Sequence, residues 1–228
     1  MNILSISTSS DICSVCVGNE THILKENFIR NARTHSEHLM PLIEQTLKDC
    51  QLDLKDIDYF ACDIGPGSFT GIRIGIATIK AIAQITGKPI CAVSSLEGLA
   101  YAIEKPSTWI ASLIDARNDQ VYAGLWDDKH QAIGELMADD IHIVLEKFAL
   151  YQKPITFVGN GSILHQKIIQ DYNPNNAFFS EQNDLLASHV WKASLSHIAQ
   201  GNLVNADTLL PLYLRKSQAE RMKENSGK

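Results

Sequence analysis

Three short stretches of the sequence carry residues whose types and spacing could do chemistry. The first is DIGPGSFTGIRIG, residues 63–75, a glycine-rich turn between a predicted strand and a predicted helix, where proteins often hold phosphate. The second is Cys13-Ser-Val-Cys16, which has the spacing of a redox or zinc pair. The third is His35-Ser-Glu-His38, whose two histidines share one face of a helix and could both bind a metal.

The glycine-rich stretch matches neither common phosphate-binding motif. It lacks the Lys-Ser/Thr pair of a P-loop, and Thr70 stands where the dinucleotide fingerprint has its third glycine. Gly65 and Gly67 free the backbone for a tight turn, while Ser68 or Thr70 can cap the helix that follows. The helix-start loop, which we define as Gly65, Gly67, Ser68, Thr70 and Gly71, could accept an anion on its amides. It supplies no nucleophile, base or metal ligand.

The cysteine and histidine pairs are explained more simply as structural. Residues 12–18 have the pattern of a strand, on which positions three apart point to opposite faces, so Cys13 and Cys16 are expected to be buried thiols. An odd count of five cysteines also favours free thiols. His35 and His38 have no third ligand nearby, and polar groups at a helix start usually cap amides. The sequence therefore predicts no metal site and no catalytic residues.

Composition bounds the class of protein. The chain has 228 residues, of which 45% are apolar and 20% charged, enough for one large globular domain or two small ones. A net charge of −6 disfavours binding nucleic acid without a partner. No apolar run reaches the roughly 20 residues that a membrane span needs. The first residues resemble a strand rather than a signal peptide, so a cytoplasmic location without membrane contact is expected.

Apolar periodicity predicts two successive α/β units that open with a similar hairpin. The first unit has strands at 2–7, 12–17, 22–28, 59–64 and 89–93, and helices at 36–50, 70–86 and 96–103. A polar break at 104–108 precedes the second unit, with strands at 109–115, 121–126 and 155–158, and helices at 141–149 and 184–200. The predicted domains are 1–104 and 105–214, with a C-terminal helix that can pack back on the first, followed by a charged tail at 215–228.

The helix predicted over 70–86 is apolar on two opposite sides. One side carries Ile72, Ile76, Ile79 and Ala83, and the other carries Ile74, Ala77, Ala81 and Ile85. A surface helix of a monomer needs only one apolar side, so the second must also be covered. The cover is either another part of this chain, such as the second domain or the helix at 36–50, or another subunit. We favour a subunit interface, because a domain this small has little material to bury a helix twice.

Several motifs together resemble one family, TsaB, also called YeaZ. They are GPGSFTGIRIG, the first strand, the HSEHL helix start and PLYLRKSQAE near the C-terminus, and the resemblance covers nearly the whole chain. It implies an α/β fold of two tandem actin-like ATPase (ribonuclease H-like) domains. It also implies a part in the bacterial complex that adds a threonylcarbamoyl group to the adenosine next to the anticodon of tRNAs reading A-starting codons. There TsaB is the non-catalytic partner that activates the catalytic paralogue TsaD together with the ATPase TsaE.

Two departures from the catalytic relatives agree with that division. Their metal-binding His-Met-Glu-Gly-His stretch resembles residues 95–99 here, where Ser95 and Leu99 replace the histidines. Actin-like ATPases place an aspartate near the phosphates and the magnesium, and TsaB relatives often keep it; Ser7 stands there in this chain, which departs from the family's usual pattern too. Asp115 remains in the second hairpin, but one carboxylate is not a catalytic pair. The resemblance therefore implies no cofactor of its own, with at most weak ATP or ADP binding at the partner interface.

The resemblance places the partner surface on the first two helices of the chain. Its predicted residues are Leu39, Ile43, Leu47, Ile74, Ala77, Ala81 and Ile85. This surface would hold TsaD in a heterodimer and a second copy in a homodimer when the chain is alone, and tRNA would be reached only through the complex. Two other hypotheses remain: a peptidase-like enzyme acting on TsaD, for which the sequence offers no Ser-His-Asp or Cys-His set, and a self-contained ATPase.

Overall fold

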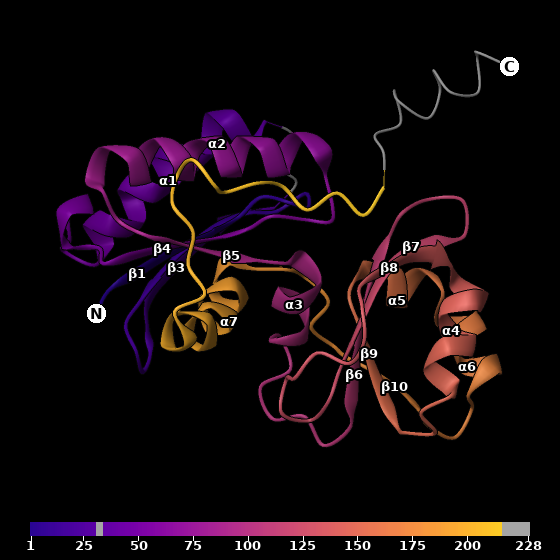
Figure 1. The fold of residues 1–228 in the computed structure, drawn as a ribbon. Coiled ribbons are helices and arrows are strands. Elements are labelled where there is room, and N and C mark those ends of the chain that lie inside the picture. Colours follow the sequence, from indigo (N-terminus) through magenta and orange to yellow (C-terminus); the bar gives the residue numbers. More distant parts are fainter. Residues whose placement is uncertain (31–33, 216–228) are drawn as a thin grey trace, which may run out of the picture.

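The first half of the chain forms a five-stranded mixed sheet (Figure 1). A computed structural model describes residues 1–30 and 34–215. The order of the strands is β3-β2-β1-β4-β5, with bounds Ile23–Ile29, Cys13–Gly18, Ile3–Ser7, Tyr59–Asp63 and Ile90–Val93. The pairs β1–β2 and β2–β3 are antiparallel, whereas β1–β4 and β4–β5 are parallel. β1 is the central strand, and all its residues are buried.

The second half repeats this arrangement. Its five-stranded sheet has the order β10-β9-β6-β7-β8, with bounds Ala177–Phe179, Ile155–Val158, Trp109–Asp115, Gln120–Trp126 and Met137–Asp140. Here too the pairs β6–β7 and β7–β8 are antiparallel, whereas β6–β9 and β9–β10 are parallel. The two sheets therefore share one topology, in agreement with the predicted repetition of the hairpin.

Helices cover both faces of each sheet (Figure 1). In chain order they are α1 His35–Asp49, η1 Leu54–Asp56, α2 Phe69–Thr86, α3 Ser95–Ala100, α4 Ile141–Ala149, α5 Asn160–Leu164, α6 Gln166–Tyr172 and α7 Ala187–Gln200. α1 and α2 lie side by side on one face of the first sheet, and α7 packs on the other face. α3 lies between the two sheets, while α4 and α6 lie on the outer face of the second sheet.

Three clusters of buried apolar side chains result from these layers. One lies between the first sheet and α1 and α2, and one between the second sheet and its outer helices. The middle cluster joins both sheets through α3 and α7, with Ile3 and Val93 from the first sheet and Ile110 from the second. Cys13 lies in the first cluster and Cys16 in the middle one, which confirms that they point to opposite faces of their strand.

The predicted α/β class is confirmed, and most of the predicted elements are present. The periodic patterns missed β8, β10, α5 and α6, which are short. α7 follows the second sheet in the chain yet covers the first, so a shared core crosses the predicted boundary at 104. The division into two domains, 1–104 and 105–214, therefore stays a prediction. Of the predicted tail at 215–228, all but Arg215 lies outside the described residues.

A row of glycines lets the end of β1 cross close to α2. The glycines stand four residues apart at positions 67, 71 and 75, so the last two share one side of the helix. A Cβ on Gly71 would lie 2.0 Å from the carbonyl oxygen of Thr8, and one on Gly75 would lie 2.3 Å from its Oγ1. In the cleared space Thr8 Oγ1 donates a hydrogen bond to the Gly71 carbonyl at 2.9 Å. The missing side chains therefore fix how α2 sits on the sheet.

We expect Gly71→Ala to destabilise the fold by at least about 2 kcal/mol, because its methyl group would meet backbone rather than a flexible side chain. The free energy of unfolding in urea measures this. Gly87→Ala is the control: Gly87 ends α2 with a φ of 68° and has nothing within 4 Å of an added Cβ, so only about 1 kcal/mol of backbone strain is expected. An equal loss of unfolding free energy in Gly71→Ala and Gly87→Ala would contradict the close packing of Thr8 against α2.

Candidate partner surface and helix-start loop

The helix-start loop is a closed turn whose polar groups bind the protein itself. Ser68 caps α2, since its Oγ accepts a hydrogen bond from the Gly71 amide at 3.3 Å. Its own amide donates to the Ser9 carbonyl at 2.7 Å, and the Gly65 carbonyl accepts from the Ser95 amide at 2.9 Å. The predicted tight turn and cap are confirmed. Of the two candidate caps it is Ser68, not the exposed Thr70, that makes the bond.

A buried carboxylate lies beside this loop at the end of β4. Asp63 is fully buried and accepts hydrogen bonds from the Ser7 hydroxyl at 2.9 Å and from the amides of Thr8 and Ser9 at 3.2 and 3.3 Å. Burial raises its pKa, while these hydrogen bonds act in the opposite direction. An aspartate in place of Ser7 would bring a second carboxylate against this one. Ser7 and Asp63 therefore form one structural unit that holds the end of β1.

The stretch aligned with the catalytic relatives' histidines is part of the core. Ser95 and Leu99, at its two ends, are both buried. The Ser95 hydroxyl donates to the Ser9 Oγ at 3.0 Å. Within residues 1–30 and 34–215, no three His, Cys, Asp or Glu side chains come close enough together to hold a metal ion. His35, the other histidine considered for metal binding, is buried with its Nε2 2.9 Å from the Ser10 carbonyl oxygen.

A small cavity opens where the two sheets approach each other. Its volume is about 160 Å³, below the roughly 300 Å³ at which ligand pockets of proteins begin. Asp11, Asp115 and Asp184 line it, and none of its described lining residues is a lysine or an arginine. Asp115 accepts a hydrogen bond from the Arg117 amide at 2.8 Å, as expected of a residue that shapes its own turn. The cavity is thus small, with Asp11 and Asp115 on its walls beside the Asp184 carboxylate that pairs with Arg30.

The outer flank of α2 is apolar and uncovered. Ile72, Ile76, Ile79 and Ala83 are buried against the sheet, as predicted. On the other side Ala77 and Ala81 are exposed, and Ile85 is 86% exposed. Ile74 is partly buried, because it packs against the first core cluster beside α1. The structure therefore shows that the chain covers one apolar side of α2 and leaves three of the four residues predicted on the far side open.

The predicted partner residues of α1 are a different case, because the chain alone buries them, although Ile43 and Leu47 also line an open groove; their role at an interface stays a prediction. Leu39, Ile43 and Leu47 are 1%, 1% and 6% exposed and belong to the core cluster under the first sheet. An amphipathic helix has one apolar face, and α1 turns that face toward its own core. What α1 offers outward is Met40, Glu44 and Lys48, beside an open groove of about 810 Å³.

The segment after α7 covers a third side of α2, which the sequence did not predict. Leu209 is buried in the first core cluster, and its carbonyl accepts a hydrogen bond from Lys80 Nζ at 3.1 Å. Further along, Tyr213 stacks on Phe69 at 4.7 Å between ring centroids and accepts a hydrogen bond from Arg73 Nε at 2.9 Å. Two polar residues of α2, Arg73 and Lys80, therefore bind the segment that follows α7.

An ion pair joins the two helices that fill the middle of the molecule. His197 Nε2 of α7 lies 2.8 Å from Glu97 Oε1 of α3, and both side chains are mostly buried. The hydrogen bond to Glu97 raises the pKa of His197, against an opposing effect of burial. Because α3 and α7 both belong to the core shared by the two sheets, protonation of His197 strengthens this junction.

Comparisons with known proteins place the chain among proteins of tRNA modification. Residues 22–222 match the family model described as TsaD: tRNA N6-adenosine threonylcarbamoyltransferase. The tRNA threonylcarbamoyladenosine biosynthesis protein TsaB of Bacillus subtilis is 31% identical over 225 residues, covering 96% of each chain. The tRNA N6-adenosine threonylcarbamoyltransferase of Rhizobium etli is 48% identical, but only over 69 residues, which are 30% of this chain and 19% of that protein.

Solved structures agree with the fold. A crystal structure from Pseudomonas aeruginosa, described as an uncharacterized protein with similarity to peptidase YEAZ, superposes with a TM-score of 0.83 at 27% identity. It covers 94% of this chain and 99% of that one. In the part of this chain that the structure describes, no helix is both long and apolar enough to cross a membrane.

The His197–Glu97 pair predicts a pH dependence of stability. A histidine whose pKa is raised on folding stabilises fully below its unfolded value of 6.5, and that stabilisation is lost as the pH rises through the higher folded value. We therefore expect the free energy of unfolding to fall across this range in the wild type and to fall less in Glu97→Gln. Urea unfolding at a series of pH values measures this. Glu146 is exposed on α4, so Glu146→Gln is the control and should show the wild-type change of unfolding free energy with pH. If Glu97→Gln shows that same change, the His197–Glu97 pair does not contribute to stability.

Proposed function

The chain belongs to the TsaB family, and we propose that it is the non-catalytic subunit of the bacterial complex that transfers a threonylcarbamoyl group to tRNA. The relatives that cover its full length are named for tRNA threonylcarbamoyladenosine biosynthesis, and the chain takes part in that biosynthesis. The acceptor would be the adenosine next to the anticodon of tRNAs that read A-starting codons. The observation that carries the proposal is the apolar flank of α2, Ala77, Ala81 and Ile85, which the chain leaves uncovered.

Three features support a subunit that does no chemistry of its own. Ser95 and Leu99 stand where the catalytic relatives have metal-binding histidines, and a leucine cannot bind a metal. Asp63, the buried carboxylate at the strand ends, already accepts three hydrogen bonds from the protein. The small cavity between the sheets is lined by three aspartates, of which Asp184 is paired with Arg30, so it offers little free positive charge to a nucleoside triphosphate.

The cysteines also speak against the alternative of a peptidase-like enzyme acting on TsaD, a name that survives in the description of the Pseudomonas structure. A cysteine nucleophile needs a lowered pKa and access to substrate. Cys13 and Cys91 are buried, and burial raises their pKa to about 11 and about 12. Cys16 and Cys62 are buried as well, with their pKa raised by the same cause.

The partner we propose is TsaD. A segment of about 70 residues is 48% identical to one such transferase, well above the 31% shared with the B. subtilis TsaB over the full chain. Two proteins with so similar a segment can present similar surfaces, and similar surfaces associate about a two-fold axis. The same flank of α2 would then hold a second copy of this chain when TsaD is absent, so the homodimer and the heterodimer exclude each other.

The remaining members of the complex follow from this arrangement. The ATPase TsaE would join the TsaB–TsaD pair rather than either chain alone. The chain's net charge of −6 suits contact with tRNA only through the complex, because phosphate binding needs a surplus of lysine and arginine. Any weak binding of ATP or ADP would need residues from TsaD at the junction to supply the cations that the cavity lacks. Such a complex would work in the cytoplasm.

Ala81→Arg tests the proposal, because it places a charge in the middle of the open flank. We expect the affinity for TsaD to fall at least about 100-fold, since a buried unpaired charge costs about 3–5 kcal/mol. Co-elution with TsaD in size-exclusion chromatography measures the pairing, and formation of modified tRNA by the reconstituted complex measures its consequence. The circular dichroism spectrum should stay unchanged, because Ala81 is exposed in the single chain, while the homodimer on the same flank should be lost as well.

Ala149→Arg is the matched control, an exposed alanine at the far end of α4. It should pair with TsaD as the wild type does. Loss of pairing in both variants, or in neither, would contradict an interface on α2. If TsaD modifies tRNA equally well without this chain, the proposed role as its required partner is wrong.

A further inference from the structure

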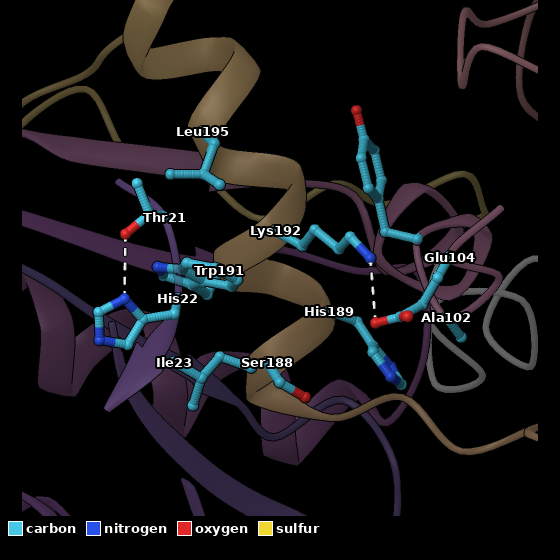
Figure 2. Close-up of a pocket in the computed structure, with 11 residues that line it drawn as sticks. Thr21, His22, Ile23, Ala102, Glu104, Ser188, His189, Trp191, Lys192 and Leu195 are labelled. Atoms are coloured by element: carbon cyan, nitrogen blue, oxygen red, sulfur yellow. Dashed lines mark hydrogen bonds and ion pairs between the residues drawn. The ribbon is translucent and has the colours of Figure 1, made fainter. Parts of the chain in front are cut away.

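A second cavity lies on the opposite side of the first sheet, away from α1 and α2. It has a volume of about 410 Å³, within the range of pockets that hold small molecules. Three elements form it: the turn between β2 and β3, the outer side of α7 and the segment that follows α3. Figure 2 shows Trp191, Lys192 and Leu195 of α7 facing Thr21 and His22 of the turn on one side and Glu104 on the other.

The walls of this cavity are apolar, with aromatic rings on two sides. Trp191, Leu195 and Ile23 line it, together with Tyr101. Stacking on His130, at 4.3 Å between ring centroids, holds the ring of Tyr101 in place. A ligand with an apolar or aromatic body would therefore find preformed contacts rather than side chains that must first be ordered.

The polar groups of the cavity include a cation and a neutral donor. Lys192 supplies one positive charge at the mouth. His189 is uncharged near neutral pH, because burial lowers its pKa to about 4. Its Nδ1 accepts a hydrogen bond from the Leu186 amide at 3.3 Å, which places the proton of the neutral ring on Nε2 as a further donor. One cation with neutral donors fits a monoanion and falls short of the charge that a polyphosphate needs.

Trp191 also has a hydrogen-bonding group without a partner. Its side chain is 6% exposed, and its Nε1 has no acceptor among the residues that the structure describes. In Figure 2 this nitrogen lies at the end of the indole ring nearest Thr21 and His22. This nitrogen packs close to Gly18, and a buried donor left unpaired destabilises the protein, so hydrogen bonding on this wall of the cavity is incomplete.

A carboxylate of the protein already occupies the mouth of the cavity. Glu104 Oε1 lies 3.3 Å from Lys192 Nζ, and Figure 2 shows this pair linking α7 to the segment after α3. The Glu104 side chain is 79% exposed and belongs to the segment between α3 and β6, outside helix and strand. Exposed ion pairs of this kind contribute little, so an incoming carboxylate can replace Glu104 at low cost.

From these observations we propose that the cavity binds a small carboxylic acid with an apolar or aromatic body. The carboxylate replaces Glu104 on Lys192, and the body packs between Trp191, Leu195 and Tyr101. This site is separate from the α2 flank and does not depend on the proposed function. It would add a ligand-binding activity at a place distinct from the small cavity between the sheets.

Phenylacetate is the probe that tests this proposal. The chain has three tryptophans, so labelling with 5-fluorotryptophan gives three ¹⁹F resonances, and the one lost in Trp191→Phe belongs to Trp191. We expect phenylacetate to shift that resonance alone in the full-length protein, at concentrations up to about 10 mM. The cation phenethylamine and the neutral 2-phenylethanol should bind much more weakly.

Two substitutions should change the affinity in opposite directions. Lys192→Met keeps the apolar stem and removes the charge, which should weaken phenylacetate binding about tenfold or more. Glu104→Gln removes the competing carboxylate, which should strengthen binding by about two- to fivefold. Lys153→Met, at an exposed lysine outside the cavity, is the control and should leave the affinity unchanged.

Several results would overturn the proposal. One is a Trp191 resonance that does not move with phenylacetate. A second is an equal response to phenethylamine or 2-phenylethanol, which would make the cavity a non-selective apolar surface. The third is an affinity that Lys192→Met or Glu104→Gln leaves unchanged, because the carboxylate would then bind elsewhere.

Discussion

The crossing of β1 over a side of α2 that carries no side chain is the contact on which the rest of the structure depends. β1 is the central strand of the first sheet, and Thr8 at its end lies against Gly71 and Gly75. This contact fixes the rotation of α2 about its own axis. With that rotation fixed, Ile72 and its neighbours must face the sheet, and Ala81 and Ile85 must face outward. The exposure of the α2 flank therefore follows from the packing of the backbone alone.

The same crossing also engages part of the glycine-rich loop in holding the fold. Its capping serine, the end of β1 and Asp63 bind one another, so their polar groups are occupied inside the protein. A phosphate-binding loop keeps its amides free to point at a ligand. Here the geometry of a strand, a glycine turn and a helix remains, and the amides of Ser68 and Gly71 bind the protein itself.

Sequence patterns predicted the periodic features well and the irregular ones poorly. The two sides of α2 and the opposite directions of Cys13 and Cys16 follow from helix and strand periods. For α1 the pattern could not tell core from interface: Leu39, Ile43 and Leu47 form its single apolar face, and that face packs on the chain's own core. The four-residue spacing of the glycines was a signal for close packing that reasoning about turns passed over. Leu209 and Tyr213 lie in a segment without period, so only tertiary structure reveals their contacts with α2.

The packing of α7 and Leu209 on the first sheet has a consequence for how the chain folds while it is being translated. α7 seals one face of the first sheet and Leu209 completes the core on the other, yet both are translated after every strand of that sheet. A nascent chain on the ribosome therefore displays the apolar face of a half-finished sheet until its last residues emerge. During that interval the growing polypeptide depends on chaperones or on rapid elongation, although the finished molecule is compact.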